Sequence, residues 1–215
     1  MIGRALAAIG ACALLSIGCS LGQGEGEVHS DKLVAHECWD REYDLLPDFF
    51  AAIPYRDTLQ IRIQRGNDLQ EVSDGLAILI DDTKKIRKEK LGVKLDVSLP
   101  RGVQPPGSPI PAPDPDSPEQ LVHMAFYLQQ SCHNQNTVLY AVSGEITFSA
   151  LFSGDPNERD ATEKYTDATF DVKVGDPRDA PLGAPAEDIP EELQSRLTGY
   201  LRFYFERGQP GQPFP

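Results

Sequence analysis

The chain of 215 residues lacks an apolar run long enough to span a membrane. Its longest apolar run, residues 5–17, has thirteen members, whereas a membrane-spanning helix needs about 20. The run follows Arg4 and ends in small residues, which is typical of the apolar segment of an export signal. We therefore expect an export signal at this end of the chain and no transmembrane helix.

Positive charge is also scarce. The formal net charge is −13 at pH 7 and the isoelectric point is about 4.7, which argues against a nucleic-acid partner, because such binding depends on cationic patches. One basic cluster stands out, and it could touch anionic headgroups or polysaccharide or form an ordinary solvated face: Lys84, Lys85, Arg87, Lys88 and Lys90.

Recognisable catalytic motifs are missing. The sequence has no GxSxG turn, no HExxH helix and no glycine-rich phosphate loop, the patterns that mark common hydrolases and nucleotide enzymes. Carboxylates are abundant, so a carbohydrate-active hydrolase built on two of them stays open as an alternative. We expect no enzyme activity and no cofactor.

Cysteines are few, and one of the four closes a motif. Ser16-Ile17-Gly18-Cys19 resembles the lipobox of bacterial lipoproteins, with Ser16 at a position where leucine is usual. The resemblance covers residues 1–20 only. It implies a signal peptide over residues 1–18, a lipid on Cys19 and a membrane partner through that lipid. Ser20 after the cysteine implies sorting to the outer membrane, so the expected location is the cell envelope.

Two cysteines, Cys38 and Cys132, remain outside this segment. In an oxidising compartment two remaining cysteines usually pair, so we predict a disulfide between them. A zinc site with His36 and His133 is the alternative. The spacing lacks a CxxC pair, and on a strand the neighbours Cys132 and His133 would point to opposite faces, so we prefer the disulfide.

Alternating apolar and polar residues predict a mainly β fold. Leu59, Ile61 and Ile63 alternate with polar residues that include Arg62 and Gln64, which predicts a strand with one wet face. Regularly spaced strands of this kind are typical of an antiparallel β-sandwich, and we expect one of the jelly-roll kind. The predicted strands are 59–63, 75–80, 93–99, 121–129, 137–142, 146–151, 170–174 and 201–205.

Helices are expected to be few and short. Asp82 and Gly92 fit the start and stop of a helix over residues 83–90, and Pro190 with Gly199 fits those of another over residues 190–199. Residues 30–39 are ambiguous between helix and strand.

The expected organisation is a polar tether over residues 19–27 and one domain over residues 28–215. A proline-rich loop interrupts the domain at residues 100–118, where eight prolines exclude a central strand. Residues 208–215 form a tail rich in glycine and proline.

Two further groups suggest binding. Asp155, Asn157 and Asp160 offer oxygen ligands of the kind that calcium takes, but the run lacks the spacing of a calcium loop and contains Arg159, so we prefer a solvated acidic loop. An aromatic-rich stretch over residues 39–55 suits either a sugar-stacking surface or the core, and we prefer the core. The sequence thus predicts a lipid-anchored envelope protein that acts as a binding or structural module. A calcium-stabilised adhesion module is the alternative.

Overall fold

The fold, a computed structural model, is built almost entirely of strands. It describes residues 24–66, 73–99, 120–133, 135, 137–185 and 187–206. Within these residues ten strands are present: β1 (Gly24–Ala35), β2 (Trp39–Leu45), β3 (Phe49–Tyr55), β4 (Thr58–Gln64), β5 (Asp74–Ile80), β6 (Lys94–Ser98), β7 (Val122–Leu128), β8 (Val138–Ala150), β9 (Tyr165–Gly175) and β10 (Ser195–Tyr204).

Helical segments in the described chain are short. An α-helical turn, α1 (Thr83–Lys85), continues as a π-helical turn, Ile86–Lys90, and α2 (Ala161–Lys164) precedes β9. The expected cap is confirmed, because the Asp82 side chain accepts a hydrogen bond from the Lys85 amide at 2.8 Å. Single 3-10 turns occupy Pro177–Asp179 and Glu191–Leu193. No helix among the described residues is both long and apolar enough to cross a membrane.

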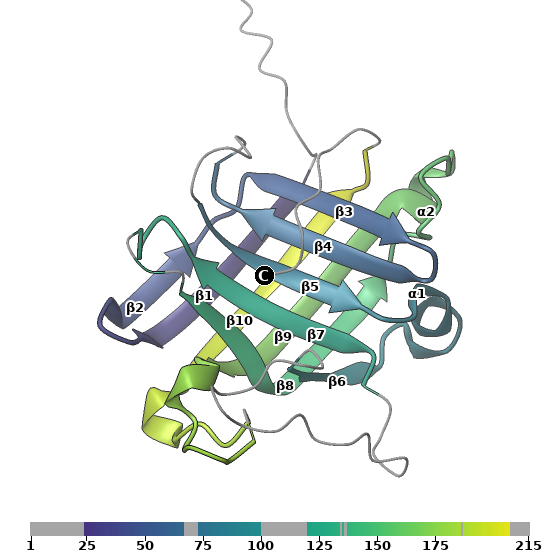
Figure 1. The fold of residues 1–215 in the computed structure, drawn as a ribbon. Helices are drawn as coiled ribbons and strands as arrows, with labels where there is room; N and C mark the ends of the chain where they lie inside the picture. Colours follow the sequence, from purple (N-terminus) through teal and green to yellow (C-terminus); the bar gives the residue numbers. More distant parts are fainter. Residues whose placement is uncertain are drawn as a thin grey trace, which may run out of the picture.

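All ten strands belong to one sheet, in the order β2-β1-β10-β9-β8-β6-β7-β5-β4-β3. Each neighbouring pair is antiparallel except β6 and β7, which run parallel. The sheet curls into a half-barrel, so that β3, β4, β5 and β7 lie in front of β1, β10 and β9 (Figure 1). The mainly β prediction is confirmed. The predicted two-sheet sandwich is not, because the strands form one connected, mixed sheet.

The core fills the concave side of the curl. Every second residue of β4 points inward, and Leu59, Ile61 and Ile63 are fully buried there. Phe50 of β3 stacks on Phe203 of β10 with ring centroids 5.9 Å apart. This contact joins strands from opposite halves of the sheet, and aromatic burial of this kind stabilises a fold by about 1.5–3 kcal/mol per side chain. The core therefore holds the two halves of the curled sheet together.

The predicted helix over residues 190–199 is wrong. Only Glu191–Leu193 forms a helical turn, and Leu197 and Gly199 lie in β10. A Cβ at Gly199 would lie 2.1 Å from the Glu27 carbonyl oxygen of β1. The glycine therefore permits a close approach of β1, where the sequence suggested a helix stop.

Other boundaries also differ from the sequence predictions. Residues 24–27 of the predicted tether pair with β10 from the first residue of β1, and the segments 137–142 and 146–151 are one long strand, β8. Residues 30–35 of the ambiguous stretch are strand. The polar face predicted for β4 is not wet, because Arg62 and Gln64 are 5% and 0% exposed. Residues 100–118 and 208–215 lie outside the described residues.

Candidate functional site

The Cys38–Cys132 disulfide is the first predicted site that the structure confirms. Cys38 lies in the turn between β1 and β2, Cys132 follows β7, and their Cα atoms are 5.9 Å apart. The bond ties the edge hairpin to the opposite half of the curl. The zinc alternative is wrong, since both sulfur atoms are consumed in the bond and zinc binds thiolates.

Asp74 anchors the same region. This buried carboxylate, the first residue of β5, accepts hydrogen bonds from the Tyr43 hydroxyl at 2.7 Å, from the backbone amides of Gln130 and Ser131 at 2.9 and 3.0 Å, and from the Ser131 hydroxyl. Burial and the bond to Asp74 both raise the pKa of Tyr43. The residues around the disulfide therefore form a satisfied structural network rather than a reactive one.

A second group of polar side chains lies on the outward face of the edge hairpin. Val28 and Ser30 point inward from β1, so His29 and Asp31 point outward, and Glu42 and Asp44 do the same from β2. These four residues are here named the His29 cluster. His29 is paired directly with Asp44 across the two strands.

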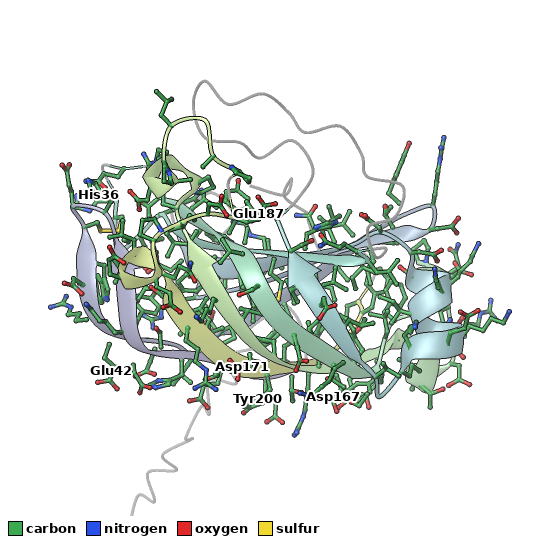
Figure 2. The ribbon with its side chains drawn as sticks, turned by 90° about the horizontal axis from the view of Figure 1, so that it is seen from below. His36, Glu42, Asp167, Asp171, Glu187 and Tyr200 are labelled. Atoms are coloured by element: carbon green, nitrogen blue, oxygen red, sulfur yellow. A yellow bond between two sulfur atoms is a disulfide. The ribbon has the colours of Figure 1, made fainter. Side chains whose placement is uncertain are left out.

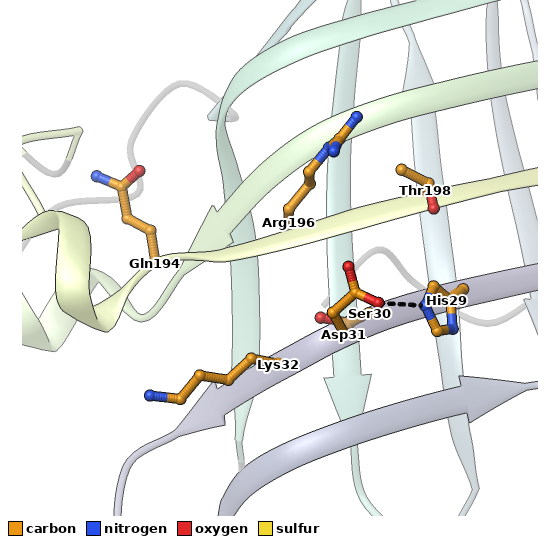
Figure 3. A pocket seen from close by; sticks show the side chains of 7 residues that line it. All are labelled: His29, Ser30, Asp31, Lys32, Gln194, Arg196 and Thr198. Atoms are coloured by element: carbon orange, nitrogen blue, oxygen red, sulfur yellow. Dashed lines mark hydrogen bonds and ion pairs between the residues drawn. The ribbon is translucent and has the colours of Figure 1, made fainter.

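The geometry of the His29 cluster favours a protonated imidazole. Nδ1 of His29 lies 2.7 Å from the Asp44 carboxylate and Nε2 lies 3.1 Å from that of Asp31. These hydrogen bonds raise the pKa of His29 from 6.5 to about 9. The bond to Asp31 is visible at one side of a surface depression whose opposite wall is formed by Gln194, Arg196 and Thr198 (Figure 3).

The same cluster has the donor set of a cation site. Ligand atoms of His29, Glu42 and Asp44 lie within 4.8 Å of one another, and an imidazole with two carboxylates is a set that zinc accepts. An ion would have to displace the proton held by His29. Exposed acidic groups of this kind are common on surfaces without a metal, so this geometry alone assigns none.

A third group lies near the disulfide, where His36, Glu37, Gln135, Asp176, Arg178 and Asp179 line an open depression. His36 Nδ1 lies 3.7 Å from Asp179, and burial, followed by the charge of Asp176, raises the pKa of Asp179. Asp176 is held by the Arg178 guanidinium, with contacts of 2.5–2.9 Å to both of its oxygens. This ion pair engages one of the three carboxyl groups that line the depression, and those of Glu37 and Asp179 lie on either side of His36, at 3.8 and 3.7 Å from its ring nitrogens.

The residues predicted to bind calcium accept hydrogen bonds from the backbone of their own loop. Asp155 Oδ1 accepts a hydrogen bond from the Asn157 amide at 2.8 Å, and Asp160 Oδ1 accepts one from the Thr162 amide at 2.9 Å, where it caps α2. The bond from the Thr162 hydroxyl at 2.8 Å, together with the amide bond, lowers the pKa of Asp160. Calcium binding there remains a prediction with no geometric support among these contacts.

The basic cluster is partly neutralised. Lys84 pairs with Asp57 at 2.6 Å, and Arg87 pairs with Glu163 of α2. These contacts reduce the positive charge available to an anionic partner. Lys88 also lies 3.9 Å from Glu89. The expected contact of this cluster with headgroups or polysaccharide stays a prediction.

The aromatic stretch is mostly buried, as we expected, although Trp39 is only partly buried against the core. Tyr43, Phe49 and Phe50 are buried, whereas Tyr55 is 66% exposed. The His29 cluster, in contrast, was missed from the sequence. The alternation of Val28-His29-Ser30-Asp31 with that of Glu42-Tyr43-Asp44-Leu45 contains the signal, because each places two polar residues on one face of a strand.

An outward charged face extends from the His29 cluster across β10 and β9. Arg196 binds the Asp171 carboxylate through two nitrogens at 2.8 and 2.6 Å, which lowers the pKa of Asp171. Arg202 lies 3.1 Å from Glu25 and 3.4 Å from Asp167. Figure 2 shows Glu42, Asp167, Asp171 and Tyr200 along this side of the sheet.

Comparison of the chain with protein-family models, with curated proteins and with solved structures found no match in any of the three.

Proposed function

We propose that the protein is a lipid-anchored component of a bacterial cell envelope, and that its folded domain binds a partner or supports envelope structure. The disulfide is the observation that carries this proposal. Bonds of this kind persist in oxidising compartments such as the periplasm and the cell surface, and they are rare in the cytosol. The Cys38–Cys132 bond thus supports export independently of the lipobox-like sequence.

The position of β1 supports a domain held close to the membrane. β1 begins at Gly24, five residues after Cys19, and an extended chain spans at most about 3.3–3.6 Å per residue. A lipid on Cys19 would therefore keep the start of β1 within about 17 Å of the bilayer surface. The lipid anchor, rather than a long tether, would fix which end of the domain faces the membrane.

The basic cluster lies toward the end of the sheet at which β1 begins. Arg87 pairs with Glu163 of α2, two residues before the start of β9. The first residue of β9, Tyr165, pairs with Tyr204, next to the position where β10 pairs with Gly24. This placement supports contact between the remaining lysines and anionic headgroups, since such charges each contribute about 1 kcal/mol near a membrane.

The charged face is the surface on which we place a polar partner, an envelope protein or a polysaccharide. It presents fixed ion pairs, and Tyr200 lies beneath the Arg202 guanidinium, 5.2 Å from the ring centroid. Aromatic rings beside polar groups suit the stacking and hydrogen bonding that sugars require. On the basis of Ser20, which follows the expected lipidated cysteine, we also propose that the protein is sorted to the outer membrane.

The anchor is tested by replacing Cys19 with alanine and following acyl incorporation and membrane fractionation. The matched control is Cys12→Ala, which removes the other cysteine of the N-terminal segment and keeps the motif. We expect Cys19→Ala alone to abolish acylation and to lose the protein from the membrane fraction. Equal acylation of both variants, or membrane retention of Cys19→Ala, would overturn the proposal.

A further inference from the structure

The outward face of β6 and β7 brings a serine beside a histidine. Val97 of β6, and Val122 and Met124 of β7, belong to the core. Because successive side chains of a strand point to opposite faces, Ser98 and His123 point outward. The two strands run parallel, and their register places Ser98 opposite His123. Two residues that are 25 positions apart in the sequence therefore lie next to each other on the sheet.

An aspartate lies on the other side of the same histidine. β5 pairs with β7, and Leu79 of β5 lies opposite His123. Asp81 comes two positions after Leu79, directly after β5, and so falls on the same outward face. Its backbone amide donates to the Leu121 carbonyl at 3.0 Å, which extends the pairing beyond the end of β5. Ser98, His123 and Asp81 are here named the Ser98 triad, and they come from the neighbouring strands β6, β7 and β5 (Figure 1).

Hydrogen bonds join the three side chains of the Ser98 triad in a row. Nε2 of His123 lies 3.2 Å from Oδ2 of Asp81, and Nδ1 lies 3.1 Å from the hydroxyl oxygen of Ser98. An ionised carboxylate only accepts hydrogen bonds, so in the neutral ring Nε2 carries the proton and donates to Asp81. Nδ1 is then the acceptor, and it takes a hydrogen bond from the Ser98 hydroxyl.

This order of contacts is that of a nucleophile, a general base and a carboxylate that orients the base. A serine hydroxyl is a weak nucleophile until an adjacent base takes its proton. Such triads occur on unrelated folds and are recognised by the geometry and the role of each residue rather than by sequence position. In many of them Nε2 faces the serine, whereas here Nδ1 does. Either nitrogen can act as the base, because the hydrogen bond made by the other decides which one carries the proton.

We propose that the Ser98 triad hydrolyses carboxylic esters through an acyl group carried on Ser98. The Ser98 oxygen attacks the carbonyl carbon while its proton passes to Nδ1 of His123. The bond from that carbon to the ester oxygen breaks, and the alcohol leaves with the proton. Water then attacks the acyl group, the carboxylic acid leaves, and a proton of the water returns through His123 to the Ser98 oxygen. This activity goes beyond the proposed function and does not depend on the lipid anchor.

The first test treats the folded full chain with diisopropyl fluorophosphate, a small reagent that labels activated serines. The Ser98 oxygen bonds to phosphorus, fluoride leaves, and the hydroxyl proton goes to His123. We expect mass spectrometry of the digested protein to find one phosphoryl group, on the peptide that contains Ser98, and none when the chain is unfolded in urea before treatment. Ser98→Ala should take no label, whereas Ser149→Ala, which removes an exposed serine of β8, should be labelled like the parent. A folded parent that is not labelled at Ser98 would overturn the proposal.

A second test separates a catalytic triad from a purely structural set of hydrogen bonds. Asp81→Asn keeps the shape of the side chain but no longer holds the His123 proton on Nε2, so hydrolysis of p-nitrophenyl acetate should slow at least about tenfold. Asp82→Asn is the matched control, because Asp82 caps α1 and asparagine caps helices equally well; it should keep the rate of the parent. Circular dichroism would verify that both variants are folded. Equal rates in the two folded variants would show that the hydrogen bonds are structural and that the proposal is wrong.

Discussion

At the scale of single residues, Asp74 joins parts of the chain that are far apart in sequence. Its oxygens accept bonds from β2 and from the turn after β7, so one carboxylate fixes three segments near the disulfide. Bonds to a buried charge contribute about 1.5–3 kcal/mol each when measured by mutation.

Replacing this carboxylate should therefore be costly. For Asp74→Asn we expect the free energy of unfolding in urea to fall by about 3 kcal/mol, since the new amide turns donors toward donors. Tyr43→Phe removes only one of the bonds and should lower the free energy by about 1.5 kcal/mol. Equal stability of Asp74→Asn and the parent would show that the network is not structural.

His29 makes a pH-dependent contribution. Its pKa is raised from 6.5 to about 9 by Asp44 and Asp31. The interaction is therefore fully present below pH 6.5 and is lost as the pH rises through about 9. We expect the ring resonances of His29 to titrate near pH 9, and those of the Asp44→Asn variant at a lower pH. A midpoint that Asp44→Asn does not move would refute the role assigned to the Asp44 pair.

Residue patterns predicted some of these features and missed others for physical reasons. Cys38 and Cys132 were predictable because only two cysteines lie outside the predicted export signal. Arg62 and Gln64 were not, because alternation tells which residues share a face and is silent on whether another part of the chain covers it.

At the scale of elements, β10 shows how a local sequence pattern can predict the wrong secondary structure. Leu193 and Leu197 are spaced as on a helix, yet Leu197 is a core residue of a strand that pairs with both β1 and β9. Strand formation depends on such partners, which are distant in sequence. The same reason explains why β1, β2 and β3 escaped prediction while the regular alternation of β4, β6 and β9 was read correctly.

Gly199 offers a direct test of this assignment. An added Cβ would lie 2.1 Å from the Glu27 carbonyl oxygen and 2.6 Å from the Phe170 ring, so Gly199→Ala should lower the free energy of unfolding by about 2 kcal/mol. Thr198→Ala, one position away on the outward face, should stay within about 0.5 kcal/mol of the parent. If Gly199→Ala left the free energy of unfolding unchanged, the close approach of β1 to this residue would be contradicted.

At the scale of the whole molecule, the curl brings together parts of the chain that are far apart in sequence. The disulfide spans a sequence separation of 94 residues, and the Phe50–Phe203 stack spans more. Alternation has the same period in a sandwich and in a curled sheet, so the sequence predicted the strands without predicting that they form one sheet.

Removing the disulfide should lower the stability of the curled sheet. In the chain-entropy account a loop of this length is stabilised by about 4 kcal/mol, so the double variant Cys38→Ala/Cys132→Ala should unfold at lower urea concentration than the parent. Adding reductant should lower the midpoint of the parent and leave that of the double variant unchanged. A midpoint in the parent that does not respond to reductant would contradict a stabilising bond.

The proposed lipid anchor and the disulfide are tested together by the intact mass of the protein isolated from its native membranes, measured with and without reduction. We predict a chain that starts at Cys19, carries added acyl mass and gains about 2 Da on reduction of the Cys38–Cys132 bond. An unacylated chain cleaved elsewhere, or a mass that reduction does not change, would contradict a lipid-anchored, disulfide-bonded envelope protein.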